Sequence, residues 1–364
     1  MGYGMTDGPI LSKAARFLLY GAAFVVLVAG VRTAEPILVP FLLAVMLAVI
    51  CATPLHWLQR KGLPTWISVL LIVLMLLGMG TMAGTLIGTS LIDFTRSLPG
   101  YQVRLEREVA ELVVWLSGHG FEVSGQLLAD SFDPGEILRI VGRIFTGVGD
   151  VLGKIALILI ITVFILLEIS GFSAKVRLAF PKANRSLLPI AEINDNVRRY
   201  LALKTLISLT TGVLVALWLR IIGVDYALLW GLLAFLLNYI PSIGSFIAAI
   251  PAVMLAFLQL GPGDGTLTLI GYLVINTAIG NFIEPRVMGE GMGLSTLVVF
   301  LSLIFWGWVL GPVGMLLSVP LTMILKIVLE ANDDTRWMAV LLGSRPAEVV
   351  VGGAADDPVE WVGT

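Results

Sequence analysis

Residues 280–321 read GNFIEPRVMGEGMGLSTLVVFLSLIFWGWVLGPVGMLLSVPL and decide what kind of protein this chain forms. The stretch places a charged sequence with a proline, Glu284-Pro285-Arg286, between long apolar runs. Ionisable groups at bilayer depth are costly and usually face a partner, a cavity or the interface, so these residues are candidates for a functional site. A cytoplasmic turn with solvated charges explains the same pattern, and position alone does not separate the two interpretations.

Composition extends the membrane interpretation to the whole chain. Hydrophobic residues make up 58% of the 364 residues, charged residues make up 13%, and the mean hydropathy is +0.97. Soluble domains average about 45 to 50% apolar and about 25% charged residues. The sequence therefore predicts an integral membrane protein. A net charge of -2 without a basic stripe gives no reason to expect nucleic acid as a partner.

The sequence offers little that is typical of enzymes or metal sites. Cys51 is the single cysteine and lies in an apolar run, while His56 and His119 are expected in different loops. We therefore expect no cysteine zinc cluster, redox pair or His/Cys metal site. Neither a nucleophile elbow nor a phosphate-binding loop occurs. We expect no enzyme activity, no cofactor and no metal, and transport that is passive or ion-coupled.

Apolar runs of about 20 residues are long enough to cross the hydrocarbon core of a bilayer. Six runs approach or exceed this length, at residues 14–31, 37–54, 66–92, 151–169, 201–222 and 267–283. Two further apolar stretches, at residues 226–260 and 294–327, are interrupted by proline and glycine. The expected fold is an all-α, polytopic helical membrane protein with about six full crossings and two broken segments.

Changes in composition divide the chain into four regions. Residues 1–92 hold the first three crossings, and residues 93–150 are mixed polar sequence that predicts a small helical extramembrane insert. Residues 151–330 form the expected transport region, with an interfacial helix before the crossing at 201–222. Residues 331–364 are expected to be a cytoplasmic, largely disordered tail.

Lysine and arginine set the expected orientation. Basic residues outnumber acidic ones between residues 169 and 204, whereas acidic residues outnumber basic ones in the 93–150 insert. The bias predicts that residues 169–204 and both termini are cytoplasmic and that the 93–150 insert is outside.

The two broken segments match in outline when Gly244 is aligned with Gly314. Their break positions are Pro241, Gly244 and Pro251 in the first, and Gly311, Pro312, Gly314 and Pro320 in the second. Paired hydrophobic segments broken by glycine or proline indicate a transporter's binding site, because half-helix ends expose backbone donors and acceptors there. Two re-entrant hairpins of inverted topology and four ordinary crossings give the same end points. Spanning helices that are kinked by proline remain an alternative.

Polar residues near these breaks complete the expected substrate or ion path. They are Asn238, Asn276, Asn281, Glu284, Pro285 and Arg286. The three amides can hydrogen-bond a polar solute, although bonding between helices is the commoner use of such residues. Glu284 is a candidate to bind a cation or a proton, with Arg286 as its counter-charge or as an anion contact. A structural ion pair between the two is the alternative.

Ordered motifs in the last third of the chain resemble a known family. They are PSIG at 241–244, NFIEPRVMG at 281–289, GL at 293–294 and WGWVLGPVG at 306–314, with Pro251 and Pro320. In these motifs, and in its layout of three helices, an insert and a helical remainder, the chain resembles the autoinducer-2 exporter family of bacterial membrane proteins. The resemblance implies an inner-membrane protein that forms homo-oligomers. It also implies export of the signal autoinducer-2, or sodium/proton antiport, as in different members.

These observations lead to one expected function and two alternatives. The expected function is a bacterial inner-membrane permease that exports a small polar solute, such as autoinducer-2 or a related metabolite, along the two broken segments. The first alternative is sodium or other cation/proton antiport with Glu284 as the titrating group. The second is a membrane scaffold that transports nothing and binds a partner through its external insert.

Overall fold

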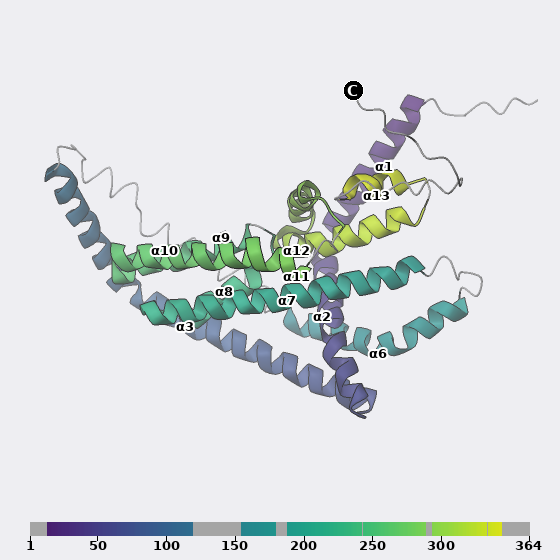
Figure 1. The fold of residues 1–364 in the computed structure, drawn as a ribbon, viewed down its shortest axis with the longest axis horizontal. Helices are drawn as coiled ribbons and strands as arrows, with labels where there is room; N and C mark the ends of the chain where they lie inside the picture. Colours follow the sequence, from purple (N-terminus) through teal and green to yellow (C-terminus); the bar gives the residue numbers. More distant parts are fainter. Residues whose placement is uncertain are drawn as a thin grey trace, which may run out of the picture.

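The structure is a computed structural model that describes residues 13–118, 154–179, 188–241, 243–288, 293–332 and 334–343. All regular structure in these residues is helical, so the expected all-α fold of a polytopic membrane protein is confirmed. The helices are α1 (Lys13–Thr33), α2 (Glu35–Arg60), α3 (Thr65–Gly118), α6 (Ile155–Ala179), α7 (Leu188–Ile222), α8 (Ala227–Leu237), α9 (Gly244–Leu260), α10 (Pro262–Thr277), η1 (Ala278–Ile283), α11 (Glu284–Met288), α12 (Thr296–Glu330) and α13 (Arg336–Leu342) (Figure 1).

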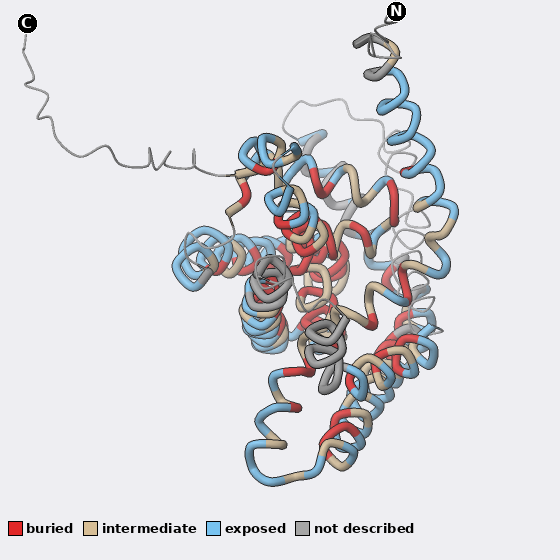
Figure 2. The backbone as a smooth tube through the Cα atoms, turned by 90° about the vertical axis from the view of Figure 1, so that its right-hand side faces the viewer, coloured by how far each residue is buried: buried red, intermediate tan, exposed pale blue. Residues whose placement is uncertain are grey.

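Five helical stretches are long and apolar enough to cross a membrane. They are Glu35–Arg60, Thr65–Ser97, Asn196–Ile222, Pro262–Val287 and Thr296–Glu330. The first four contain the crossings expected at 37–54, 66–92, 201–222 and 267–283. The other two expected crossings coincide with apolar parts of α1 and, from Ile155 onward, of α6, both of which are shorter. Large apolar side chains are exposed on the outer faces, most clearly along α1 (Figure 2). A bilayer would cover such surfaces.

Several helices are longer than the apolar runs within them. Helix α3 continues past residue 93 to Gly118 without a break, so the third crossing and the start of the expected insert form one rod. Helix α7 joins the expected interfacial helix and the crossing at 201–222. Within the expected tail, α13 forms, and the Leu342 carbonyl accepts a hydrogen bond from the Ser295 N–H. The rest of the expected insert, residues 119–153, and residues 344–364 lie outside the described residues.

Glu284-Pro285-Arg286 does not interrupt its helix. Helix α10 continues through the π-helical segment η1 directly into α11. Proline inside a helix lacks the N–H donor, and its ring clashes with the carbonyl four residues earlier. A π-helical turn closes on the fifth residue and is wider than an α-helical turn. The wide turn immediately before Pro285 therefore lets one long helix continue where the sequence predicts a break.

The first broken segment folds back on itself. Helix α8 has 11 residues and is about 16 Å long, well short of the roughly 30 Å of a hydrocarbon core. Irregular backbone follows from Asn238, and α9 then returns. The two ends meet, because the Gln259 side chain donates to the Gly223 carbonyl at 3.1 Å and accepts from the Asp225 N–H at 2.8 Å. Helices α8 and α9 therefore form a helical hairpin, as the re-entrant interpretation predicts.

The second broken segment, α12, is also a hairpin. It bends at Gly311, whose φ of 64° lies in the left-handed region that favours glycine. The Trp306 indole N–H donates to the Thr322 hydroxyl at 3.1 Å, although a straight helix would separate these residues by about 24 Å. Lys326 Nζ donates to the Gly293 carbonyl at 2.8 Å and ties the two ends together. Helix α12 is therefore long enough to cross the membrane but is folded in two.

The two hairpins share one packing feature at the aligned glycines. A Cβ atom at Gly244 would lie 1.8 Å from the carbonyl oxygen of Leu237, and one at Gly314 would lie 1.9 Å from that of Trp306. Each would also crowd the side chain four residues earlier, at 2.9 and 2.8 Å respectively. In both hairpins the returning arm therefore packs directly on the backbone of the first arm. The expected correspondence of the two segments is present in the structure.

Helices α7 and α10 lie side by side and run antiparallel (Figure 1). Lys204 of α7 contacts Glu284 at one end, and Trp218 of α7 contacts Gly271 of α10 at the other. Helix α8 packs closely on α7, since a Cβ at Gly212 would lie 2.6 Å from the Gly231 carbonyl. The largest buried apolar cluster of the described residues lies among α3, α7, α8, α9 and α10. This bundle positions the polar site described next.

Candidate functional site

A cavity of about 490 Å³ lies where α7, the α8–α9 break, the α10–η1–α11 helix and the start of α12 meet. Ligand pockets in proteins commonly have volumes of about 300 to 1,000 Å³. Its polar lining includes Lys204, Asn238, Asn276, Asn281 and Glu284. The cavity is therefore large enough for a small solute and offers amides as well as both signs of charge.

The cavity brings together six of the residues expected along the path: Asn238, Pro241, Asn276, Asn281, Glu284 and Pro285. The remaining seven lie away from its lining. Gly244 and Pro251 are buried in α9, Gly311, Pro312 and Gly314 lie at the bend of α12, Pro320 is buried in the second arm of α12, and Arg286 is exposed on α11. The structure thus concentrates the expected amides and the carboxylate at the first hairpin.

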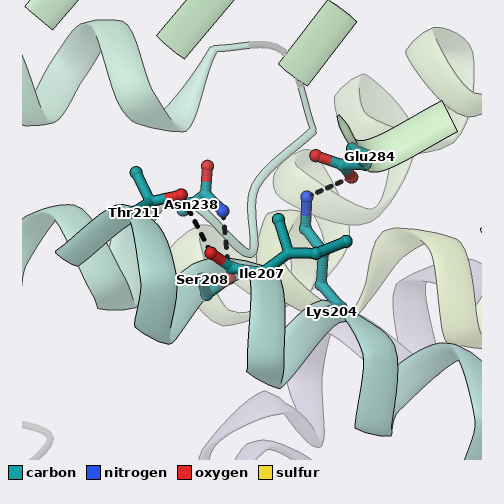
Figure 3. A network of polar contacts seen from close by, with 6 residues as sticks. All are labelled: Lys204, Ile207, Ser208, Thr211, Asn238 and Glu284. Atoms are coloured by element: carbon teal, nitrogen blue, oxygen red, sulfur yellow. Dashed lines mark hydrogen bonds and ion pairs between the residues drawn. The ribbon is translucent and has the colours of Figure 1, made fainter. Parts of the chain in front are cut away.

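Glu284 pairs with Lys204 and not with Arg286. The Lys204 Nζ lies 2.5 Å from Glu284 Oε1, and the two side chains are 4% and 23% exposed (Figure 3). Lysine comes from α7 and glutamate from the first residue of α11, so the pair joins two antiparallel helices at the cavity wall. Each of these charges compensates the other's loss of hydration, because a single buried charge is strongly unfavourable.

Lys204 lines the cavity, although the sequence interpretation includes it only among the cytoplasmic charges. A signal does exist in the sequence. Lys204, Ser208 and Thr211 have the i, i+4, i+7 spacing of one helix face within an apolar run, and all three are buried. A polar stripe in a membrane helix indicates a face that packs on protein or lines a cavity.

Asn238 attaches the first hairpin's break to this polar face of α7. Its Nδ2 donates to the Ser208 hydroxyl at 3.1 Å, one turn from Lys204 (Figure 3). The next residue, Tyr239, donates its hydroxyl to Thr205 at 2.7 Å. Asn238 is the C-cap of α8, and Pro241 three residues later lacks the N–H that a continuing helix would need. The break is therefore held by specific hydrogen bonds, and it brings an amide to the cavity.

The chemistry of this lining suits a neutral polar solute or a proton. Carboxamides both donate and accept hydrogen bonds, and the lysine–glutamate pair supplies a donor and an acceptor that can change partners. Among the described residues, no three His, Cys, Asp or Glu side chains gather as a metal site would require. Binding and movement of a solute or a proton are the functions that this lining supports.

Comparison with known proteins gives consistent matches across the chain. The family model for the AI-2E family transporter matches residues 22–333. A putative transport protein of Haemophilus influenzae is 41% identical over 335 residues, which cover 90% of this chain and 96% of that protein. The AI-2 transport protein TqsA of Escherichia coli is 40% identical over 318 residues, covering 87% and 92%. The putative transport protein YhhT of Escherichia coli is 37% identical over 337 residues, covering 92% and 96%.

Proposed function

Because the chain belongs to the AI-2E family of transporters, we propose that the cavity beside Lys204 and Glu284 binds a small polar solute that the protein moves across the membrane. The observation that carries this proposal is the meeting of three carboxamides and an ion pair at one cavity inside a strongly apolar chain. Buried polar groups in a membrane protein are costly, and they are often kept where they line a solute or ion path.

The proposed solute is autoinducer-2 or a related small metabolite, and the proposed direction is export. The relative TqsA, named an AI-2 transport protein, supports this substrate class at 40% identity. The lining supports a neutral solute with several hydroxyl groups, because each amide can donate to one hydroxyl and accept from another.

Cation/proton antiport is the second candidate, and the Lys204–Glu284 pair favours it. A carboxylate at a cavity wall can release its lysine partner and accept either a proton or a cation. Each turnover would then exchange a proton for a cation across the membrane. In this case the pair itself carries the cargo. In solute export the pair only shapes and gates the cavity.

Transport by the purified chain in proteoliposomes tests both functions. We expect autoinducer-2 to cross the membrane with no added partner protein, at a rate well above that of empty liposomes. A sodium flux that requires a pH gradient, without autoinducer-2 flux, would favour antiport instead. Absence of both fluxes would leave only the scaffold alternative and would refute the transport proposal.

We propose the orientation that follows from the lysine and arginine bias, with both termini and residues 169–204 cytoplasmic. In a Cys51→Ser background, an impermeant thiol reagent should modify a Ser124→Cys variant in intact cells. The same reagent should leave Ser173→Cys unmodified until the cells are opened. The reverse labelling pattern would overturn the orientation.

A further inference from the structure

Helix α3 continues beyond its apolar span, Thr65–Ser97, and contacts the base of the first hairpin (Figure 1). Ile87, Phe94 and Tyr101 are seven residues apart, so they lie on one face of α3. All three are buried in the apolar cluster that α3 shares with α7, α8, α9 and α10. The contact thus begins within the span and ends on residues 98–118, which we call the α3 extension.

Two hydrogen bonds join the α3 extension to both ends of the first hairpin. The Tyr101 hydroxyl donates to Asp225 Oδ2 at 2.9 Å, just before α8 begins. Arg104 Nη1 donates to the Gln259 carbonyl at 2.5 Å, just before α9 ends. Burial and the hydrogen bond to Asp225 raise the pKa of Tyr101 well above its ordinary value, so its hydroxyl remains a donor at neutral pH. One helix therefore holds both the start and the end of the hairpin.

The hairpin begins with a strained residue that lies against α3. Tyr226 has a φ of 59° and is the one residue other than glycine with a positive φ in the part of the chain that the structure describes. Such a backbone conformation persists only where the surrounding structure holds it. The Phe94 ring of α3 packs edge to face on the Tyr226 ring, with centroids 6.2 Å apart. On the other side, the Trp230 indole N–H donates to the Asp225 carbonyl at 3.0 Å. The contact with α3 is therefore part of what fixes the start of the hairpin.

The opposite end of the hairpin forms part of the cavity wall. Helix α8 spans about 16 Å from the base to the break. Asn238, Pro241 and Ser245 at the break all line the cavity. The two arms cannot shift independently there, because a Cβ at Gly244 would already lie 1.8 Å from the Leu237 carbonyl oxygen. A change of tilt at the base therefore displaces the whole break.

We propose that Tyr101 is a positioning residue for transport, which holds the first hairpin through Asp225 so that Asn238 and Pro241 face the cavity. The α3 extension is the start of the expected insert, so this contact gives the insert control over the cavity. The effect of Tyr101 on flux rests on the proposed transport function. Its effect on the position of the hairpin does not.

The accessibility of a thiol at the cavity end of the hairpin tests this role in the full-length protein in detergent. The reporter is Ser245→Cys in a Cys51→Ser background, and it is modified with a small maleimide. Tyr101→Phe and Asp225→Ala each remove the hydrogen bond, so the hairpin leaves its position more often and we expect modification to be about five-fold faster or more. Asp225→Asn retains an acceptor oxygen for the Tyr101 hydroxyl and should keep the rate close to that of the wild type.

Two controls separate positioning from a general loosening of the protein. The native Cys51 thiol is buried in a different cluster, between α2, the start of α3 and α6. In a chain without the reporter, Tyr101→Phe should leave the modification rate of Cys51 unchanged. Arg96→Gln is the control on α3, because the Arg96 side chain is 78% exposed and pairs with Asp93 of the same helix. An unchanged reporter rate in Tyr101→Phe and Asp225→Ala, or an equal acceleration at Cys51, overturns the positioning role.

Flux in proteoliposomes connects the position of the hairpin to transport. Tyr101→Phe should raise the autoinducer-2 concentration that gives half-maximal flux, because the displaced Asn238 no longer meets the solute. Asp225→Asn should keep the wild-type value. Wild-type flux kinetics in Tyr101→Phe, together with a faster reporter, would overturn the role in transport. A wild-type protein without flux refutes the proposed function and leaves the thiol measurement valid.

Discussion

Glu284→Gln is expected to reduce transport by about 100-fold or more and to destabilise the protein. The variant leaves the Lys204 ammonium, with 4% of its side chain exposed, without its carboxylate at 2.5 Å. Breaking a buried ion pair by removing one partner costs about 3 to 5 kcal/mol, because the remaining charge is buried alone. The rate of autoinducer-2 flux in proteoliposomes and the unfolding midpoint in detergent measure the two effects. Lys204→Met should act in the same direction.

The double variant Lys204→Met/Glu284→Gln separates function from folding. Removing both charges should restore most of the stability, since neither charge is left buried alone, but it should not restore flux. Wild-type flux in the double variant would show that the pair is only structural. Arg286→Gln is the control on the same helix, and its exposed side chain predicts wild-type stability and flux. Wild-type flux in both Glu284→Gln and Lys204→Met would refute the proposed site.

Gly244→Ala and Gly314→Ala are each expected to prevent normal folding of one hairpin. The added Cβ would lie 1.8 or 1.9 Å from a backbone carbonyl oxygen, which no rotamer change can relieve. The arms must separate, at an expected cost of about 3 kcal/mol or more, the upper end of the range for overpacked sites. Yield of monodisperse protein and the unfolding midpoint report the loss.

Gly84→Ala is the matched control for these two substitutions. Gly84 lies in α3, and a Cβ there would meet nothing within 4 Å. Alanine also favours helix over glycine by about 1 kcal/mol, so the control should be neutral or stabilising. A Gly244→Ala or Gly314→Ala protein with wild-type yield and midpoint would contradict the close packing of the hairpin arms.

Features that depend on local chemistry could be predicted from the sequence. The break near Asn238 and Pro241 and the bend at Gly311 are both present, because proline removes a backbone donor and glycine tolerates a positive φ at these positions. The cavity amides were also accessible, since an asparagine in an apolar helix must find a polar partner or line a polar space.

Features that depend on how distant helices rotate and align could not be predicted. Lys204 and Glu284 are far apart in the sequence, and their contact requires the antiparallel register of α7 with α10 and α11. Arg286 is the nearer cation along the chain, but it lies on the exposed side of its helix. Hydropathy likewise locates apolar stretches without showing that α3 continues through Asp93 as one helix. Charge counts assign residues to sides of a membrane and contain no information about pairing.

The wide π-helical turn of η1 sets the direction in which the Glu284 side chain points around the helix axis. Each α-helical residue turns the chain by about 100°, so Glu284, eight residues after Asn276, would point about 80° away from it in a regular helix. A turn with one extra residue removes about one residue of that rotation and leaves an angle of about 20°. The amide and the carboxylate therefore face one cavity because the helix between them is irregular, and a perfectly regular α10 would direct Glu284 toward a different neighbour.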